Sequence, residues 1–255
     1  GNPMQKTVNC RRLDSNMLKL IAIVAMTADH IAWLLFPGYP AEPLPIILHI
    51  IGRLTCPVMC FFIAEGYHYT HDVKKYTARL FVLAVISHFA YVLASNDFVD
   101  WHSFIPFYYG SVLNQTGVIW SLAWGLVMLR VAKDERLGMP VKVILTLLIC
   151  AAALPADWSC IASLSIMSIG MNRGEPKKQI AWCVLWVAVY AVVYFFAIDK
   201  IYGLVQLCAV LAVPLLFLYN GKRGRSPKIN KFMKWLFYAY YPLHLLVIGI
   251  IRELV

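Results

Sequence analysis

The sequence predicts an all-α, polytopic transmembrane helical bundle. Hydrophobic residues make up 61% of the 255 residues and charged residues only 14%, and the mean hydropathy is +0.68. A soluble domain carries about 25% charged residues. Backbone groups inside a bilayer must bond internally, so a spanning chain forms helices or a closed barrel. The apolar runs are long and continuous rather than alternating with period two, which favours helices.

Nine apolar runs predict about nine spans, because the longer runs reach the roughly 20 residues that cross a bilayer as a helix. We expect helices over Leu18–Phe36, Leu44–Tyr67, Leu80–Ala94, Val112–Val131, Val141–Leu154, Trp158–Met171, Ile180–Ala197, Ile201–Tyr219 and Trp235–Ile251. The short fifth and sixth segments are also compatible with a re-entrant pair. Residues 1–255 are interpreted as one integral-membrane domain, with 1–16 as a cytosolic N-terminal segment and 1–3 as an expression scar.

The positions of the basic residues predict the orientation. With the N-terminus inside, 20 of the 23 Lys and Arg residues fall on the inner side, as the positive-inside rule requires. The exceptions are Lys200, Arg252 and Arg53, and Arg53 lies within a predicted span. An N-in, C-out topology follows. The net charge of +10 thus reflects topology, and no nucleic-acid partner is expected because no basic stripe alternates with exposed aromatics.

Asp29 and His30 are adjacent near the far end of the first predicted span. An ionisable group in that setting costs at least ~2.5–3.5 kcal/mol on insertion scales. The other ionisable groups that we place in or at the ends of spans are Arg53, Glu65, His88, Asp157 and His244. Packing alone explains such a set poorly, since intramembrane ionisable residues mark transport pathways or functional sites.

Two functional classes compete for this set. A proton-coupled transporter or channel would stack acids and histidines across the membrane depth, whereas an enzyme would use a histidine beside an acid as a general base. Adjacent helical residues point about 100° apart. Asp29 therefore does not readily orient His30, and a pair with Arg53 that leaves His30 free is the alternative. A third hypothesis, an interaction subunit of a pilus or secretion machine without chemistry, leaves the buried set unexplained.

Polar loops frame these groups. Residues 68–79, HYTHDVKKYTAR, and residues 220–225, NGKRGR, place basic residues on the predicted inner side, where solvated charges that set the topology are the simpler explanation. Residues 220–224, NGKRG, also form a flexible, donor-rich loop of a composition suited to phosphates. The loop Ser95–Gly110 is rich in acids and aromatics and is long enough to fold over a site as a lid. The seven cysteines are scattered without zinc spacing, so we expect no metal site.

Several separated blocks of the chain form a familiar series. They are LKLIAIVAMTADHIAWLLF, HIIGRLTCPVMCFFIAEGY, KKYTARL and, near the end, PLLFLYNGKRGRSPKINKFMKWLFYAYYPLHLLVIGII. In this order they resemble the TraX family, named for the membrane acetylase of F-type conjugative pilin, over most of the chain. The middle departs from the family pattern at Asn114–Trp120 and at Asp157–Ser159, where the Asn and the Asp are retained but their neighbours differ.

The resemblance implies an acetyltransferase of the bacterial inner membrane that uses cytosolic acetyl-CoA. It makes His30 the general base toward an acceptor amine or hydroxyl, with Asp29 in support and Arg53, Tyr241 or His244 polarising the thioester carbonyl. Residues expected to bind CoA are Lys74, Lys75, Arg79, Glu65, Tyr67, Asn220, Lys222 and Arg223. Those expected on the acceptor side are His88, Asn114 and Asp157. The acceptor is expected to be a pilin N-terminal amine or another exported peptide, a lipid or a cell-wall molecule.

Overall fold

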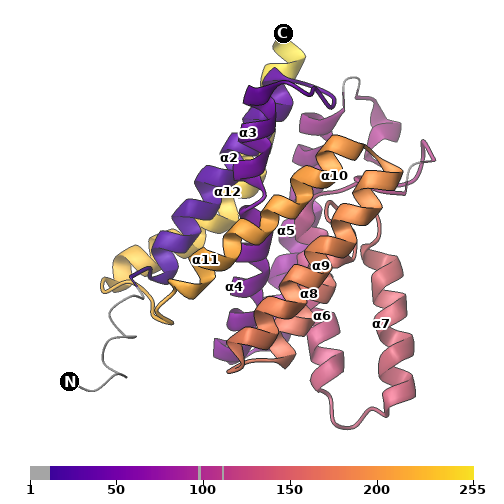
Figure 1. Cartoon of the computed structure of the whole chain (residues 1–255). Helices are drawn as coiled ribbons and strands as arrows, with labels where there is room; N and C mark the ends of the chain where they lie inside the picture. Colours follow the sequence, from indigo (N-terminus) through magenta and orange to yellow (C-terminus); the bar gives the residue numbers. More distant parts are fainter. Residues whose placement is uncertain (1–11, 97–98, 111) are drawn as a thin grey trace.

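Helices pack side by side in the computed structural model, which describes residues 12–96, 99–110 and 112–255 (Figure 1). The proposed scar and most of the N-terminal segment 1–16 lie outside the described residues, as do residues 97 and 98 of the predicted lid. The helices are α2 (Ser15–Leu35), α3 (Pro43–Gly52), α4 (Thr55–Tyr69), α5 (Val73–Ser95), α6 (Val118–Lys133), α7 (Met139–Ala153), α8 (Ile161–Met171), α9 (Pro176–Ala197), α10 (Lys200–Gln206), α11 (Ala212–Phe217) and α12 (Pro227–Leu254), with 3-10 helices η1 (Trp101–Phe104) and η2 (Leu207–Leu211).

The all-helical fold is confirmed for the described residues, and each predicted segment is helical over most of its length. Within the described ranges, six helical runs have the length and hydropathy to cross a membrane: α2, α3–α4, α5, α9, α10–α11 and α12. Helices α6, α7 and α8 have 16, 15 and 11 residues and fall short of the roughly 20 that a span needs. Nine crossings therefore stay a prediction.

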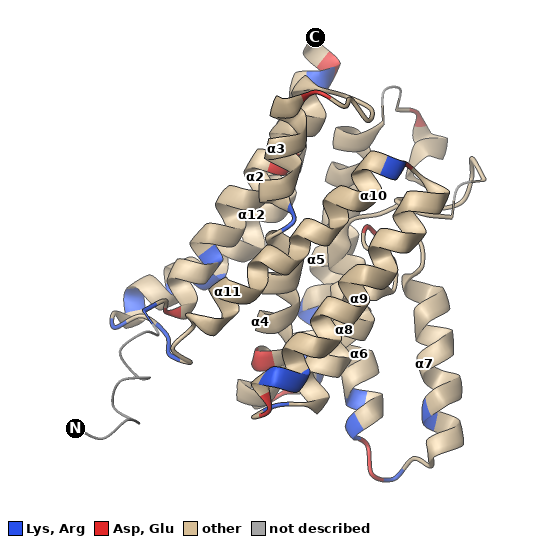
Figure 2. Ribbon diagram, in the orientation of Figure 1, with Lys and Arg blue, Asp and Glu red and all other residues tan. Residues whose placement is uncertain are grey.

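Charged residues are distributed unequally between the two ends of the bundle. In Figure 2 most Lys and Arg residues lie toward the lower end, where the described chain begins, and few lie toward the upper end. The turns 70–72, 134–138 and 172–175 and the loop 218–226 lie at this lower end in Figure 1. We call it the basic end. The asymmetry is the one on which the predicted N-in topology depends.

The second predicted segment is broken into two helices. Helix α3 ends at Gly52 and α4 begins at Thr55, with Arg53 and Leu54 between them. Pro57 has no N–H and cannot bond to the carbonyl of Arg53, so a continuous helix loses a hydrogen bond at this point. The predicted uninterrupted helix was therefore wrong here, and Arg53 lies at a helix end.

Two helices begin earlier than their apolar runs. Helix α5 begins at Val73 because the Asp72 carboxylate accepts the Lys75 N–H (3.0 Å), which caps the helix. Helix α12 begins at Pro227, where the Ser226 side chain caps the first turn. The basic residues before Leu80 and Trp235 are thus helical rather than part of flexible turns, which corrects the predicted boundaries.

Isolated β-bridges join distant segments at two places. Leu13 pairs with Tyr219, which ties the start of the described chain to the loop after α11. Thr116 pairs with Ala156, and the Asp157 N–H donates to the Thr116 carbonyl (2.8 Å). The second bridge fixes Asp157 beside the beginning of α6.

Helices α6 and α8 make a close contact through small residues. The Ser121 hydroxyl donates to the Ser159 carbonyl (2.5 Å), and the Ser163 hydroxyl donates to the Ser121 carbonyl (2.5 Å). A Cβ atom on Gly125 would overlap the side chain of Ile166. Small and hydroxyl-bearing residues at a helix interface are typical of membrane bundles, because they allow backbones to approach.

Replacing Gly125 with Leu should force α6 and α8 apart. Overpacking of a close contact costs about 1–3 kcal/mol, so the thermal unfolding midpoint of the purified protein in detergent should fall. Ala151→Leu, on the exposed face of α7, is the control and should leave the midpoint unchanged. Equal midpoints for the two variants would contradict this packing.

Candidate functional site

A small polar cavity lies between α2, the α3–α4 break, the turn at residues 157–158 and α12. Its volume is about 30 Å³. The lining consists of Met26, Asp29, His30, Gly52, Arg53, Thr55, Cys56, Met59, Val118, Asp157, Trp158 and Tyr241. Five predicted site residues, from four separate parts of the chain, therefore meet at one point.

Asp29 and Arg53 form a buried ion pair. The Arg53 Nη2 atom lies 2.8 Å from Asp29 Oδ1, and the side chains are about one-tenth exposed. Arg53 also donates from Nη1 to Gln206 Oε1 on α10 (2.8 Å). A buried carboxylate needs such a partner, because an unpaired charge in a low-dielectric setting costs several kcal/mol. The geometry matches the alternative in which Asp29 pairs with Arg53 rather than orienting His30.

His49 is a site residue that the sequence analysis did not single out. Its Nδ1 atom lies 2.7 Å from Asp29 Oδ1, and the ring packs against Trp33 and Tyr202 with centroid distances of 4.4 and 5.3 Å. A carboxylate only accepts hydrogen bonds, so Nδ1 carries the proton. The available signal was the spacing to Arg53, since residues four apart share a helix face.

Gly52 permits α3 to approach α2 at the ion pair. A Cβ atom at this position would overlap the Cβ and Cγ atoms of Asp29. The absence of a side chain thus lets Asp29 reach His49 and Arg53 on the same short helix end. Asp29 is only 7% exposed as a result.

His30 turns away from Asp29 and contacts His244 on α12. His30 Nδ1 lies 2.9 Å from His244 Nε2 and 2.9 Å from the Met26 carbonyl oxygen. His244 Nδ1 lies 2.8 Å from the Tyr240 carbonyl oxygen. Both ring nitrogens of His244 are therefore bonded within the protein, and its side chain is outside the cavity lining. His30 lines the cavity directly.

Asp157 is held in an unusual turn. The two residues after it, Trp158 and Ser159, have φ values of 64° and 50°, a left-handed conformation that is uncommon for residues other than glycine. The Asp157 carboxylate accepts the Trp158 N–H (3.0 Å). Trp158 stacks on Tyr190 with ring centroids 4.2 Å apart. Packing thus maintains a strained backbone that directs Asp157 into the cavity, and such strain clusters at functional sites.

Tyr241 completes the wall beside the beginning of α6. Its hydroxyl oxygen accepts the Val118 N–H (3.2 Å), one of the unpaired amides of the first helical turn. A Cβ atom on Gly117 would overlap this hydroxyl, so glycine is needed for the approach. Because the oxygen is the acceptor in this bond, the hydroxyl proton is available for another partner.

His88 and Asn114 are not in the cavity lining. His88 joins two loops to α5: its Nδ1 lies 2.9 Å from Thr116 Oγ1 and its Nε2 lies 2.8 Å from the Phe104 carbonyl oxygen. Asn114 has a φ of 56°, and its carbonyl accepts the Tyr91 hydroxyl (3.4 Å). Of the three residues predicted on the acceptor side, only Asp157 lies at the cavity.

The described part of the predicted lid, residues 99–110, is an ordered turn. Asp100 caps η1 by accepting the Ser103 N–H (3.0 Å), and it also accepts from Tyr109 (3.1 Å). Burial raises the pKa of Asp100, but hydrogen bonds from His102, Ser103 and Tyr109 outweigh this effect and hold the pKa below its ordinary value. The cavity lining includes no residue of this segment.

A larger cleft lies at the basic end. Its volume is about 190 Å³, and its lining comes from α4, α8, α9, α11 and two adjacent loops: Phe61, Ile169, Gly174, Pro176, Gln179, Ile180, Cys183, Val213, Leu216, Phe217, Tyr219 and Gly221. Gly174 and Gly221 have positive φ values of 85° and 75°, and neither has an atom within 4 Å of its Cβ position. At Gly174 and Gly221 the backbone therefore borders the cleft without a side chain.

The residues predicted to bind CoA fall into separate groups. Asn220, Lys222 and Arg223 flank Gly221 of the cleft. Glu65 reaches the other loop through Arg173 (3.6 Å), which precedes Gly174. Tyr67 lies under Lys133, with Nζ 5.4 Å from the ring centroid. Arg79 and Arg223 both interact electrostatically with Lys234. Lys74 and Lys75 lie on the first turn of α5, where Lys75 pairs with Asp72 (3.9 Å).

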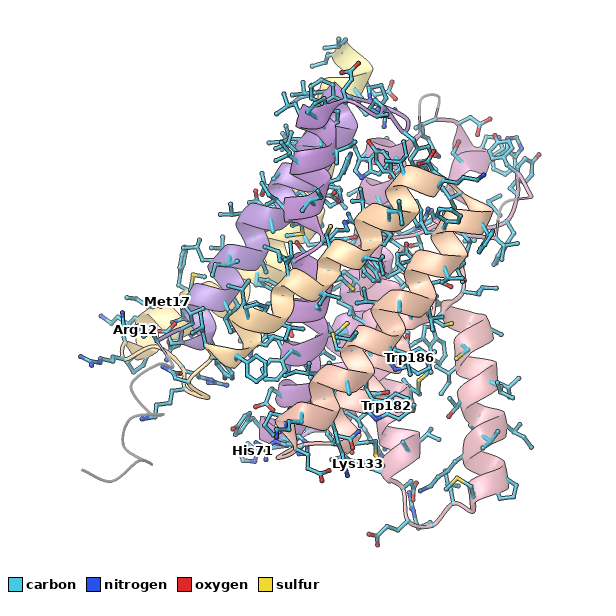
Figure 3. The ribbon with its side chains drawn as sticks, in the orientation of Figure 1. Arg12, Met17, His71, Lys133, Trp182 and Trp186 are labelled. Carbon is cyan, nitrogen blue, oxygen red and sulfur yellow. The ribbon has the colours of Figure 1, made fainter. Side chains whose placement is uncertain are left out.

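The side chains at the basic end are spread over a wide area. Figure 3 labels Arg12 and Met17 at one side of this end, and His71 and Lys133 at the other. Trp182 and Trp186 lie between this end and the middle of α9. The basic residues are thus not one patch, and the cleft distinguishes those next to the loop 219–223 from the rest.

Helix α4 contributes residues to the lining of both cavities. Cys56 and Met59 line the small cavity and Phe61 lines the cleft. Cys56 and Phe61 are five positions apart, which is about 7.5 Å along a helix axis. The two cavities therefore border the same helix at positions less than two turns apart.

Comparison with known proteins shows similarity over most of the chain. The family model described as "TraX protein" matches residues 14–252. The chain is 31% identical over 241 residues to a "Probable fimbrial assembly protein FimC, serogroup H1" of Dichelobacter nodosus, covering 89% of this chain and 91% of that protein. It is 34% identical over 95 residues to an uncharacterized protein of Rickettsia prowazekii (strain Madrid E), covering 37% and 34% of the two chains. No solved structure matches.

Replacing Arg53 with Met should destabilise the protein more than removing both charges. The single change leaves the Asp29 carboxylate buried beside His49 alone, a loss of about 3–5 kcal/mol for a broken buried pair. The double variant Asp29→Asn, Arg53→Met removes the stranded charge and should recover part of the unfolding free energy, measured by denaturant titration in mixed micelles. Strictly additive effects would contradict the coupling.

Proposed function

We propose that this chain, which belongs to the TraX family, is a membrane-embedded acetyltransferase that transfers an acetyl group from acetyl-CoA to an acceptor amine or hydroxyl. The relative described as a fimbrial assembly protein supports a pilin subunit as acceptor. The observation that carries the proposal is the position of His30 in a small cavity with Asp29, Arg53, Asp157 and Tyr241, which shares the helix α4 in its lining with a cleft at the basic end.

His30 is the general base of the proposed reaction. It lines the cavity, while neighbouring Asp29 is neutralised by Arg53. As the acceptor nitrogen or oxygen bonds to the thioester carbonyl carbon, His30 takes its proton. The carbon–sulfur bond to CoA then breaks, and His30 returns the proton to the departing thiolate. Each turnover thus leaves His30 ready for the next, and base catalysis of this kind contributes about 10²–10⁴-fold.

Tyr241 is the best-placed donor to the carbonyl oxygen. Its hydroxyl oxygen already accepts the Val118 N–H, so its own proton is available to the negative charge that develops on the substrate. Of the other two expected donors, Arg53 is bound to both Asp29 and Gln206, and His244 is bonded through both ring nitrogens. One well-placed oxyanion donor is worth about 10²–10³ in kcat. Asp157 faces the same cavity and would attract the ammonium form of an amine acceptor.

The cleft at the basic end is the proposed CoA site. Tyr219 and Gly221 line it, Lys222 and Arg223 follow directly in the chain, and Arg173 lies at the opposite loop. These cations suit the phosphates of CoA, while the apolar side chains of α9 and α11 suit the pantetheine arm. In this proposal the basic end faces the cytosol of a bacterial inner membrane and the acceptor arrives from the opposite side.

The polar layer itself favours an enzyme over a transporter. A proton pathway needs titratable groups stacked across the membrane, but Asp29, His30, Arg53 and Asp157 surround one cavity instead. The hypothesis of a non-catalytic interaction subunit gives no reason for His30 to line that cavity. Binding of CoA separates the enzyme from both alternatives.

His30→Ala should reduce acetyl transfer from acetyl-CoA to a pilin N-terminal peptide by at least ~10²-fold, because the reaction loses its base. The assay measures acetylated peptide by mass spectrometry with purified protein in detergent. His102→Ala, in the loop outside the cavity lining, is the matched control and should retain activity. Full activity of His30→Ala would overturn the assignment.

CoA should stabilise the protein through the cleft. A ligand at 100 times its Kd adds about 2.7 kcal/mol to the free energy of unfolding, which raises the thermal midpoint. The double variant Lys222→Ala, Arg223→Ala should lose most of this rise. Lys74→Ala, Lys75→Ala removes the same charge from the first turn of α5, outside the cleft lining, and should keep it. An equal loss in both double variants would place the CoA phosphates elsewhere.

A further inference from the structure

The hydrogen bonds around His30 determine which of its nitrogens carries the proton. A backbone carbonyl only accepts, so His244 Nδ1, which is 2.8 Å from the Tyr240 carbonyl, must be an N–H donor. In a neutral ring the other nitrogen is then an acceptor, and this nitrogen is His244 Nε2. The His244 atom that faces His30 is therefore an unprotonated nitrogen, Nε2, which presents its lone pair.

His30 Nδ1 consequently lies between two acceptors. These are His244 Nε2 and the Met26 carbonyl oxygen, each at 2.9 Å. A lone pair on His30 Nδ1 would face both of them, so this atom carries the proton and donates. The alternative, in which His244 donates from Nε2, places a lone pair of His30 against the Met26 carbonyl. Only the Nδ1–H form of His30 satisfies every contact.

The orientation of His244 is itself fixed by Tyr240. The two rings are parallel within 8°, with centroids 5.1 Å apart. The Tyr240 hydroxyl bonds to Thr27 Oγ1, and the Thr27 hydroxyl donates to the Ile23 carbonyl (2.7 Å). The single hydroxyl proton of Thr27 is donated to that carbonyl, so Tyr240 is the donor in the bond to Thr27. A chain of defined hydrogen bonds thus joins α12 to the turn of α2 that precedes His30.

We propose that His244, clamped by Tyr240 and Thr27, is a positioning residue that holds His30 in the Nδ1–H tautomer and so makes Nε2 the basic atom facing the cavity. This inference rests on the proposed function. His244 plays the part that a carboxylate plays in a serine-protease triad, with a neutral imidazole in its place. When His30 accepts a proton at Nε2, its Nδ1–H remains bonded to the His244 lone pair, which stabilises the charged ring.

This role accounts for two features together. Asp29 is directly adjacent in sequence, yet it serves Arg53 and His49 and leaves His30 without a carboxylate partner. His244 is 8% exposed and outside the cavity lining, although it bonds to a residue that lines it. A group that acts through His30, rather than on the substrate, fits both observations.

The test combines kinetics with a spectroscopic signature. His244→Leu should lower kcat for acetyl transfer by about 10²-fold or more while KM for acetyl-CoA changes by no more than about twofold, because the base rather than binding is affected. His244→Gln, whose side-chain oxygen accepts from His30 Nδ1–H, should recover activity to within about tenfold of wild type. Leu243→Ala, on the exposed face of α12, is the control and should behave as wild type.

The tautomer is measured directly by ¹⁵N NMR of the purified protein, with the His30 signals assigned from a His30→Gln difference spectrum. Wild type should show protonated Nδ1 and unprotonated Nε2 at neutral pH, and His244→Leu should lose this preference. A wild-type Nε2–H tautomer, or full activity of His244→Leu, would overturn the inference. The NMR result does not depend on acetyl transfer, so a catalytically active His30→Ala would overturn the proposed function while leaving the tautomer assignment intact.

Discussion

The buried carboxylate of Asp29 is the constraint on which the rest of the site depends. It needs two donors inside an apolar bundle, and it receives them from His49 and Arg53, one helical turn apart. That arrangement requires a glycine at position 52, the last residue of α3, where a side chain would overlap Asp29. Pro57 supplies the reason for the break, because it removes the hydrogen bond that would continue the helix.

Pairing of Asp29 within the protein separates two adjacent residues into different roles. Asp29 connects α2 to α3 and, through Arg53 and Gln206, to α10. His30 faces α12 and the cavity instead. The charge of Asp29, which is costly to bury, thus has a structural role. The imidazole of His30 beside it is the group that is open to the cavity. In the proposed reaction the thioester reaches the base from one side and the acceptor from the other. A base that is fixed in place and not engaged in an ion pair suits this arrangement.

Periodicity and composition were sufficient to predict the helical bundle and to single out Asp29, His30, Arg53 and Asp157 among the polar groups within it, because intramembrane charges must find partners or line cavities. Tyr241 was named only through the family resemblance. Periodicity and composition did not reveal His49, since a histidine in an apolar run carries no sign of which face it occupies. The break at Arg53 followed from Pro57, a signal that was present but outweighed by continuous hydropathy. Residues proposed for CoA were chosen by charge and loop position, and neither property reports which loops border a cleft. Among them, Asn220 and Lys222 are adjacent in the chain to its lining residues, and Arg223 is one position further on.

In the proposed mechanism, acetyl-CoA extends from the cleft at the basic end into the small cavity beside His30. A cryo-EM structure of the protein with an analogue in which a methylene group replaces the thioester sulfur would show whether it does. We expect the nucleotide beside Lys222 and Arg223 and the analogue's carbonyl oxygen about 2.7–3.1 Å from the Tyr241 hydroxyl. An analogue bound with its acyl end outside the cavity, or at α5 rather than in the cleft, would contradict it.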